Sequence, residues 1–183
     1  IIHLATHSYF YSYQEKADSL MLEQHDQSAT AIARLRQQKN ALLRSGLALS
    51  GANRWACEPQ QDNFMENGIL TAEEIRNLNL TNSELVVLSA CDTAVGDALA
   101  GETVFGFRRA FIIAGAGTLV MSLWKVPEPQ TQRLMVQFYK NLQAARPRAE
   151  ALREAQLALK KQGVTLLSWG AFICQGEFAP LSF

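Results

Sequence analysis

The sequence predicts an α/β fold, in which a mostly parallel sheet is flanked by helices. Short apolar segments of strand length alternate with longer segments of helical length, an order typical of parallel α/β layers. The segment ELVVLSA at residues 84–90 is almost continuously apolar, as a strand buried on both faces should be. The chain has 183 residues, of which 48% are hydrophobic, so we expect one folded domain over residues 1–183.

Two strands and two helices are predicted before the strand at residues 84–90. Residues 1–6 are apolar and short, as a buried strand is, and GLALS at residues 46–50 predicts the next strand. Thr71 with Glu74 three residues later forms a capping box, which predicts a helix through about Leu78. The remaining predictions are a loop over 9–13, a helix over 28–43 and a loop over 51–65.

The second half of the chain predicts the rest of the sheet and its helices. A loop follows the strand at 84–90, and the glycines at 115 and 117 end the helix that comes next. Pro127 and Pro129 interrupt the chain before another helix begins. The predicted ranges are helices over 103–114, 130–143 and 148–162 and strands over 118–123 and 169–174.

Charge and hydropathy give no reason to expect nucleic acid or a membrane as a partner. Lys plus Arg total 17 and Asp plus Glu total 17, so the formal net charge is zero. No apolar run reaches the roughly 18 residues that span a bilayer, and the chain has no secretory signal at its start. The first residue is not Met and the opening residues already predict a strand. We therefore expect the C-terminal part of a larger protein, whose preceding part supplies neighbouring strands.

The three cysteines, Cys57, Cys91 and Cys174, are widely spaced along the chain. An odd number at such spacing is a poor disulfide framework and fits a reducing compartment, so we expect a cytoplasmic location. No pair of cysteines has metal-ligand spacing, so no metal site is expected. The sequence has no nucleotide-binding glycine loop, and we expect no cofactor.

Two of the predicted strands end in a reactive residue, His7 in one case and Cys91 in the other. Ligands of open parallel sheets bind where the strands have their carboxyl ends, so these residues are expected to be neighbours. An imidazole beside a thiol raises the thiolate fraction and can then protonate the leaving amine. A single Cys at the end of an apolar strand is usually an inert core residue, and a single His there is often structural. The hypothesis of a catalytic site therefore depends on His7 and Cys91 occurring together.

A set of short segments, in the same order over nearly the whole chain, closely resembles CHAT-domain proteins. That family is caspase-like and is commonly attached to tetratricopeptide repeats. The resemblance implies a caspase-like three-layer sandwich and a cysteine endopeptidase of bacterial regulated proteolysis, controlled by attached repeats or a partner. The segments are LATHSYF, LLRSGLALSGAN, NGILTAEEI, LVVLSACDTAVGD, GETVFGFRRAF, AGAGTLVMSLWKV and ALREAQLAL.

The resemblance also assigns roles to particular residues. The catalytic His of the family matches His7 in ATH, and its catalytic Cys matches Cys91 in SAC. Relatives often have Gly after the catalytic His, where its N–H is thought to help form the oxyanion hole. Here that residue is Ser8, so we expect backbone N–H groups of Ser8 and Cys91 in this role. His3 is expected to be structural, and residues 14–43 are longer than in many relatives, which indicates an inserted helical segment.

Four residues are candidates for binding the substrate. Asp92 directly follows Cys91, and Glu128 lies after the strand that ends in LW, a region that borders the substrate groove in caspase-like enzymes. Acidic groups there would favour Lys or Arg before the scissile bond. Ser122 and Trp124 lie on the strand that leads to the groove and are expected to line it.

Several alternatives are open at this point. Asp92 can instead cap a turn or the next helix, and Arg108 with Arg109 indicates either an acidic substrate preference or the exposed face of a helix. The chain can also be a catalytically silent binding module, against which the retention of both His7 and Cys91 argues. A third alternative is another thiol-dependent α/β enzyme, such as an acyl transferase or amidase.

Overall fold

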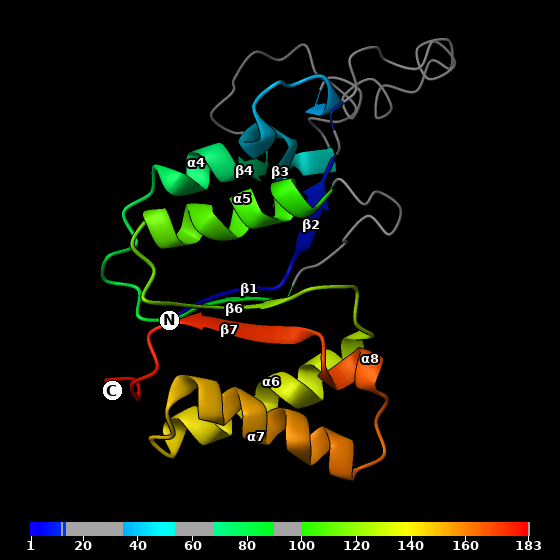
Figure 1. The fold of residues 1–183 in the computed structure, drawn as a ribbon, viewed down its shortest axis with the longest axis vertical. Coiled ribbons are helices and arrows are strands. Elements are labelled where there is room, and N and C mark those ends of the chain that lie inside the picture. The colour runs from blue at the N-terminus through cyan, green and yellow to red at the C-terminus, as the bar shows by residue number, and fades with distance from the viewer. Residues whose placement is uncertain (12, 14–34, 54–67, 90–99, 183) are drawn as a thin grey trace. The chain divides into compact units, whose positions relative to one another are not determined.

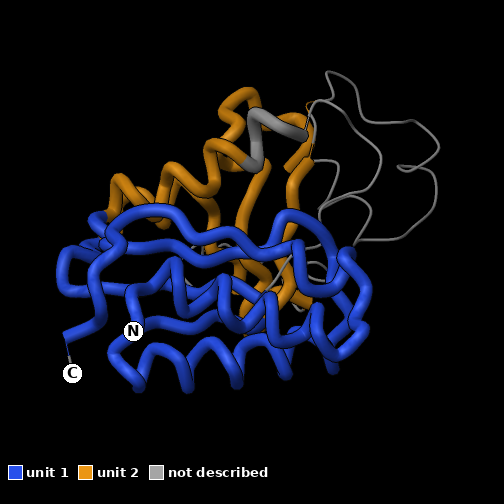
Figure 2. The backbone as a smooth tube through the Cα atoms, turned by 60° about the horizontal axis from the view of Figure 1, so that its bottom comes forward, with its two compact units in different colours: residues 1–5, 79–91, 115–183 blue, residues 6–78, 92–114 orange. Residues whose placement is uncertain are grey.

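The structure is a computed structural model, and it describes residues 1–11, 13, 35–53, 68–89 and 100–182. The chain is divided between two compact units (Figure 2). Unit 1 comprises Ile1–Ala5, Asn79–Cys91 and Gly115–Phe183, and unit 2 comprises Thr6–Leu78 and Asp92–Ala114. In the described part of the chain, no helix is both long and apolar enough to cross a membrane.

Unit 1 contains a four-stranded sheet in the order β1-β5-β6-β7. The strands are β1 (Ile2–Leu4), β5 (Val86–Leu88), β6 (Thr118–Ser122) and β7 (Phe172–Gly176). β1, β5 and β6 are parallel, and β7 is antiparallel to β6. All three residues of β5 are buried, which explains why its sequence is continuously apolar. Leu4 on β1 is the register partner of Leu88 on β5.

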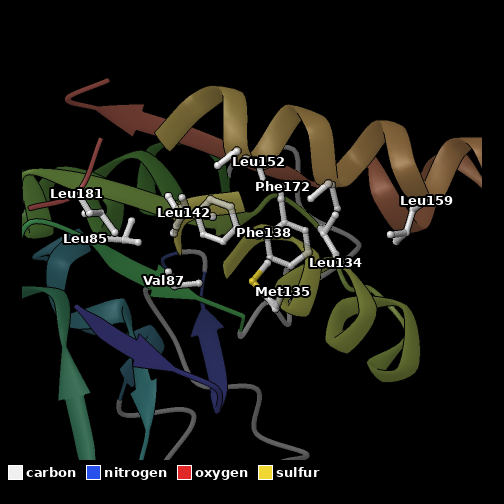
Figure 3. Packing of buried hydrophobic residues seen from close by; sticks show 14 residues of the cluster. Leu85, Val87, Leu134, Met135, Phe138, Leu142, Leu152, Leu159, Phe172 and Leu181 are labelled. Atoms are coloured by element: carbon white, nitrogen blue, oxygen red, sulfur yellow. The ribbon is translucent and has the colours of Figure 1, made fainter. Parts of the chain in front are cut away.

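Helices α6 (Glu128–Gln143) and α7 (Arg148–Lys161) lie together on one face of this sheet, and the short helix α8 (Leu166–Trp169) precedes β7 (Figure 1). α6 begins after Pro127 and carries Pro129 in its first turn, where the missing N–H has no helical acceptor. Phe138 of α6 packs among leucine side chains of both helices and of the sheet (Figure 3). The core includes Leu85, Val87, Leu134, Met135, Phe138, Leu142, Leu152, Leu159, Phe172 and Leu181.

A buried arginine joins several segments of unit 1 near the start of β5. The Arg148 side chain is only 2% exposed, and its guanidinium donates to Glu84 Oε2 at 2.7 Å and to Thr118 Oγ1 at 2.8 Å. The backbone N–H of Arg148 donates to the carbonyl of Phe178, and the N–H of Ser182 donates to Glu84. The charge is therefore compensated inside the unit, which makes its burial tolerable.

Unit 2 contains a three-stranded antiparallel sheet in the order β2-β3-β4. Its elements are β2 (His7–Phe10), the 3-10 helix η1 (Ala41–Arg44), β3 (Ser45–Ala48), β4 (Ile69–Thr71), α4 (Ala72–Arg76) and α5 (Ala100–Ile113). Phe107 of α5 packs edge-on against Phe10 at 5.2 Å and against Phe111 at 5.5 Å between ring centroids. A Cβ at Gly46 would come within 2.6 Å of the Leu70 carbonyl oxygen, so the close approach of β3 and β4 requires glycine there.

The fold class predicted from the sequence is confirmed, since a mostly parallel sheet is flanked by helices. The capping box is present, because Glu74 N–H donates to Thr71 Oγ1 and Thr71 N–H donates to the Glu74 carboxylate. The predicted strands at 46–50, 84–90 and 118–123 and helices at 103–114, 130–143 and 148–162 are found with small shifts at their ends.

Some element predictions need correction. The first strand ends at Leu4, and residues 7–10, predicted in part as a loop, form β2, because Ser8 and Phe10 alternate as buried residues with more exposed neighbours. The last predicted strand begins later than expected, since Trp169 ends α8. The predicted helix over 28–43 falls partly outside the described residues. Its end is replaced by η1, which Asn40 caps by accepting a hydrogen bond from the Leu42 N–H.

Candidate active site

His7 and Ser8 are the first two residues of β2 in unit 2. His7 is exposed and is paired with Ala48 of β3, whereas Ser8 is 3% exposed and is paired with Leu47. The Thr6 hydroxyl donates to the Ala48 carbonyl, so a side-chain contact fixes the chain just before His7. The backbone carrying the candidate base is therefore held by the sheet and does not lie in an unsupported loop.

Cys91 and Asp92 lie outside the described residues. The structure does describe the strand that leads to them. The Ser89 N–H donates to the Leu4 carbonyl at 3.1 Å, so the parallel pairing of β5 with β1 extends one residue beyond Leu88. Leu4 of β1 and Leu88 of β5 are register partners. In sequence, His7 lies three residues after Leu4, and Cys91 lies three residues after Leu88.

The three other candidate residues belong to unit 1. Ser122 ends β6 and is 3% exposed, paired with Phe172 of β7. Trp124 is partly buried, and its indole N–H donates to the Leu167 carbonyl at 2.7 Å. Glu128 is exposed and is the first residue of α6, so its carboxylate also favours the helix N-terminus electrostatically.

A hydrogen-bonded group that was not predicted lies at the end of β5. His3 Nε2 is 3.1 Å from Ser89 Oγ, and His3 Nδ1 is 2.9 Å from the hydroxyl of Tyr139 on α6. Partial burial lowers the pKa of His3 and raises the pKa of Tyr139 to about 12. A structural role is predicted for His3 from the sequence, but no sequence signal connects it with a tyrosine on a distant helix.

Cys174 has the features of an unreactive thiol. It lies on β7, is partly buried and packs against the core of unit 1. Burial raises the pKa of this thiol, an effect that the charge of Arg148 partly opposes. Its thiolate fraction at neutral pH is accordingly low, which supports Cys91 over Cys174 as the candidate nucleophile.

Two further places in the described residues were considered as sites, a surface hollow and any group of possible metal ligands. A surface hollow of about 250 Å³ lies between α6 and α7, lined by side chains such as Arg133, Val136 and Gln137. It holds neither a nucleophile nor a general base. Within the described ranges, no three His, Cys, Asp or Glu residues are grouped closely enough to hold a metal ion.

Comparison with protein families gives a match over almost the whole chain. The model of the CHAT domain matches residues 1–177, and the chain therefore belongs to the CHAT domain family. This family is caspase-like, is generally linked to peptidase activity and is often associated with tetratricopeptide repeats. No curated protein sequence matched the chain significantly.

Proposed function

We propose that this chain is a cysteine endopeptidase that cleaves peptide bonds of a protein substrate with Cys91 as nucleophile and His7 as base. The observation that carries the proposal is the parallel register of β1 and β5. Leu4 and Leu88 are paired, and the chain reaches His7 and Cys91 the same number of residues beyond them. Residues that follow the carboxyl ends of paired parallel strands are expected near the same edge of the sheet, where such folds bind their ligands, and this expectation supports the proposal.

The proposed chemistry has two steps. The Cys91 thiol gives its proton to the His7 imidazole, and its sulfur attacks the carbonyl carbon of the scissile bond. The imidazolium then protonates the leaving amine, and water hydrolyses the thioester that remains. Backbone N–H groups of Ser8 and Cys91 are proposed to stabilise the oxyanion. The exposure of His7 agrees with a base that must meet a substrate.

For substrate preference, we propose that Asp92 and Glu128 select Lys or Arg before the scissile bond. Glu128 is exposed and available for this role. Trp124 is proposed to line the groove, because its ring is held by the Leu167 carbonyl and remains partly exposed. Ser122 is more deeply buried, so we assign it a supporting place in the wall of the groove.

The wider setting is also a proposal. Residues 1–183 would act as one peptidase domain, and the segment over 14–43 would be an insertion, most of which lies outside the described residues. The association of the family with tetratricopeptide repeats supports a repeat region or another protein as the regulator. We place this regulated proteolysis in the bacterial cytoplasm.

A peptide-library cleavage assay tests the proposal. Cys91→Ala and His7→Ala should each reduce cleavage by at least about 10³-fold, because each removes a group that takes part in the reaction. Cys174→Ala is the matched control and should stay within about twofold of the unaltered chain, since that thiol is partly buried and poorly ionised. Cleavage that persists in Cys91→Ala would reject Cys91 as the nucleophile. A folded chain that binds peptides without cutting them would identify a silent binding module.

The same library tests the preference for basic residues. We expect Lys or Arg before the cut, and we expect Asp92→Asn or Glu128→Gln to weaken that preference by about tenfold. An acidic residue at this position of the products would instead favour Arg108 and Arg109 as the selecting groups.

A further inference from the structure

His3 occupies the middle of a hydrogen-bonded chain that joins three elements of unit 1. The ring lies on β1, and its two nitrogens meet Ser89 at the end of β5 and Tyr139 on α6. A neutral imidazole has one donor and one acceptor nitrogen, and a hydroxyl can supply the complement of either. Both nitrogens of a neutral His3 are therefore satisfied by these two contacts.

We propose that His3 is a positioning residue, which ties Ser89 to Tyr139 and thereby fixes the end of β5 from which the chain continues to Cys91. The proposal rests on the proposed function, because the group whose position matters is the nucleophile of that reaction. It adds a task for three residues, His3, Ser89 and Tyr139, that the Cys91/His7 assignment leaves without one.

The need for such a tie follows from the shortness of the strands. β1 and β5 each have three residues, and although β5 is paired with β6 as well as with β1, the register pairs of β5 end at Leu88 on both sides. Ser89 contributes its N–H to Leu4 and its hydroxyl to His3, and Cys91 lies only two residues further on. A nucleophile displaced by about 1 Å can lose on the order of 100-fold in rate.

Tyr139 is a firm anchor for this tie. Its neighbour in sequence, Phe138, is fully buried in the core of unit 1, and the Tyr139 ring packs against that core. The rings of Tyr139 and His3 are also in contact, with centroids 5.7 Å apart. The hydrogen bond from this hydroxyl therefore connects the end of β5, through His3, to a well-packed helix.

Ser89, His3 and Tyr139 form a hydrogen-bonded series, and a serine bonded to a histidine also suggests a second catalytic site with Ser89 as nucleophile. The chemistry of the third group argues against it. Tyr139 has a pKa raised to about 12 and is a neutral phenol at physiological pH, so it supplies no negative charge to an imidazolium. Among the described residues, no carboxylate is bonded to His3, and partial burial lowers the pKa of its ring. The arrangement suits orientation better than proton abstraction.

The first test is amide hydrogen exchange at Ser89, whose N–H is bonded to the Leu4 carbonyl. Tyr139→Phe removes the hydroxyl and keeps the ring, so we expect exchange at Ser89 to be about tenfold faster. His3→Ala should do the same, and His3→Gln, which has a donor and an acceptor, should restore most of the protection. Tyr9→Phe is the matched control, since the buried Tyr9 hydroxyl has no hydrogen-bond partner within the described part of the chain.

The second test is steady-state peptide cleavage by the same variants. Tyr139→Phe and His3→Ala should lower kcat by about tenfold or more and leave KM within about twofold, because misplacement affects the reacting atoms and not substrate binding. Tyr9→Phe should leave both constants unchanged. An unchanged kcat in His3→Ala would overturn the link to catalysis.

The two readouts separate this proposal from the proposed function. If the unaltered chain shows no Cys91-dependent cleavage, the proposed function fails, and with it the catalytic part of the positioning role. Exchange at Ser89 still decides whether His3 holds the end of β5, and unchanged exchange in both His3→Ala and Tyr139→Phe would overturn that. Labelling of Ser89 by a fluorophosphonate, lost in His3→Ala, would also overturn the proposal, because Ser89 would then be a nucleophile.

Discussion

The two units of the chain are stabilised in different ways. Unit 1 has a continuous apolar core between a sheet and two long helices, in which residues such as Phe138 and Leu142 are fully buried. Unit 2 has strands of three or four residues, and its described buried residues include Phe10, Leu47 and Phe107 as well as Ser8, Arg44 and Ser45. We therefore regard unit 1 as the main scaffold. Both units also bury polar side chains, Thr118, Ser122, Arg148 and Ser168 in unit 1, and the units differ in the partners of their buried arginines.

Arg44 shows how unit 2 uses polar contacts. Its guanidinium donates to the backbone carbonyls of Tyr11, Gln38 and Lys39, and so joins the end of η1 to the residue after β2 and to the segment before η1. Arg148 of unit 1 is buried to a similar degree but is paired with the carboxylate of Glu84. One arginine orders irregular backbone, and the other links regular elements.

The largest expected effect is the loss of a core phenylalanine. Phe138→Ala in unit 1 and Phe107→Ala in unit 2 should each lower the free energy of unfolding by about 3–5 kcal/mol, because both rings are fully buried. Chemical denaturation measures this loss, and amide exchange shows which strands lose protection. If Phe107→Ala were clearly the more damaging change, unit 1 could not be regarded as the main scaffold.

A smaller effect is expected at the ion pair between the buried Arg148 and Glu84, whose side chain is 41% exposed. Glu84→Gln leaves the charge of Arg148 poorly compensated and should lower the free energy of unfolding by about 2–3 kcal/mol. Glu177→Gln is the control, since that carboxylate is 3.6 Å from Arg148 and its side chain is 66% exposed, so we expect about 0.5 kcal/mol or less. Equal losses in urea denaturation would contradict the assignment of Glu84 as the main partner.

The capping box of α4 tests the dependence of unit 2 on local polar contacts. Thr71→Ala removes the acceptor for the Glu74 N–H and should cost about 1 kcal/mol in the free energy of unfolding. Thr81→Ala removes an exposed hydroxyl in a turn of unit 1, where we expect at most about 0.5 kcal/mol. A loss at Thr81 as large as that at Thr71 would show that the capping box of α4 contributes no more than an ordinary exposed hydroxyl.

The smallest effect is a pH dependence that originates at His3. Its pKa in the folded chain is below the value of about 6.5 expected when unfolded, so the unfolded state takes up the proton first as the pH falls. Its contribution to stability is complete above about pH 6.5 and is lost as the pH falls towards the folded pKa. Unfolding free energies at pH 7.5 and 5.5 should differ less in His3→Gln than in the unaltered chain. An identical difference would show that His3 does not contribute.

The sequence predicts the parts of the fold that have strong local signals. The apolar run at residues 84–90 predicts β5, and Thr71 with Glu74 predicts the start of α4. β2 was missed because its aromatic residues suggested a loop, although the alternating burial of Ser8 and Phe10 is a strand pattern. The turn-forming Asn40, which caps η1, likewise explains why a 3-10 helix replaces the end of the helix predicted over 28–43.

In the candidate site too, residues with a local sequence signal can be predicted, and contacts that depend on tertiary packing cannot. His7 and Cys91 could be chosen from the sequence because they follow apolar strands and match family segments. The contact between His3 and Tyr139 could not, since it depends on how α6 packs against the sheet. Tertiary contacts between distant segments leave no local sequence pattern, so the contact between His3 and Tyr139 is found only in the structure.

The contacts of Arg148 and Glu84 also determine how far the C-terminus of the chain can be shortened without loss of folding contacts. The family match ends at residue 177, yet the Phe178 carbonyl accepts from the Arg148 N–H, the Ser182 N–H donates to Glu84, and Leu181 belongs to the core. A chain shortened to the matched range would expose apolar surface and leave Glu84 with one fewer donor. The folding boundary of the domain thus lies beyond the boundary drawn by sequence similarity.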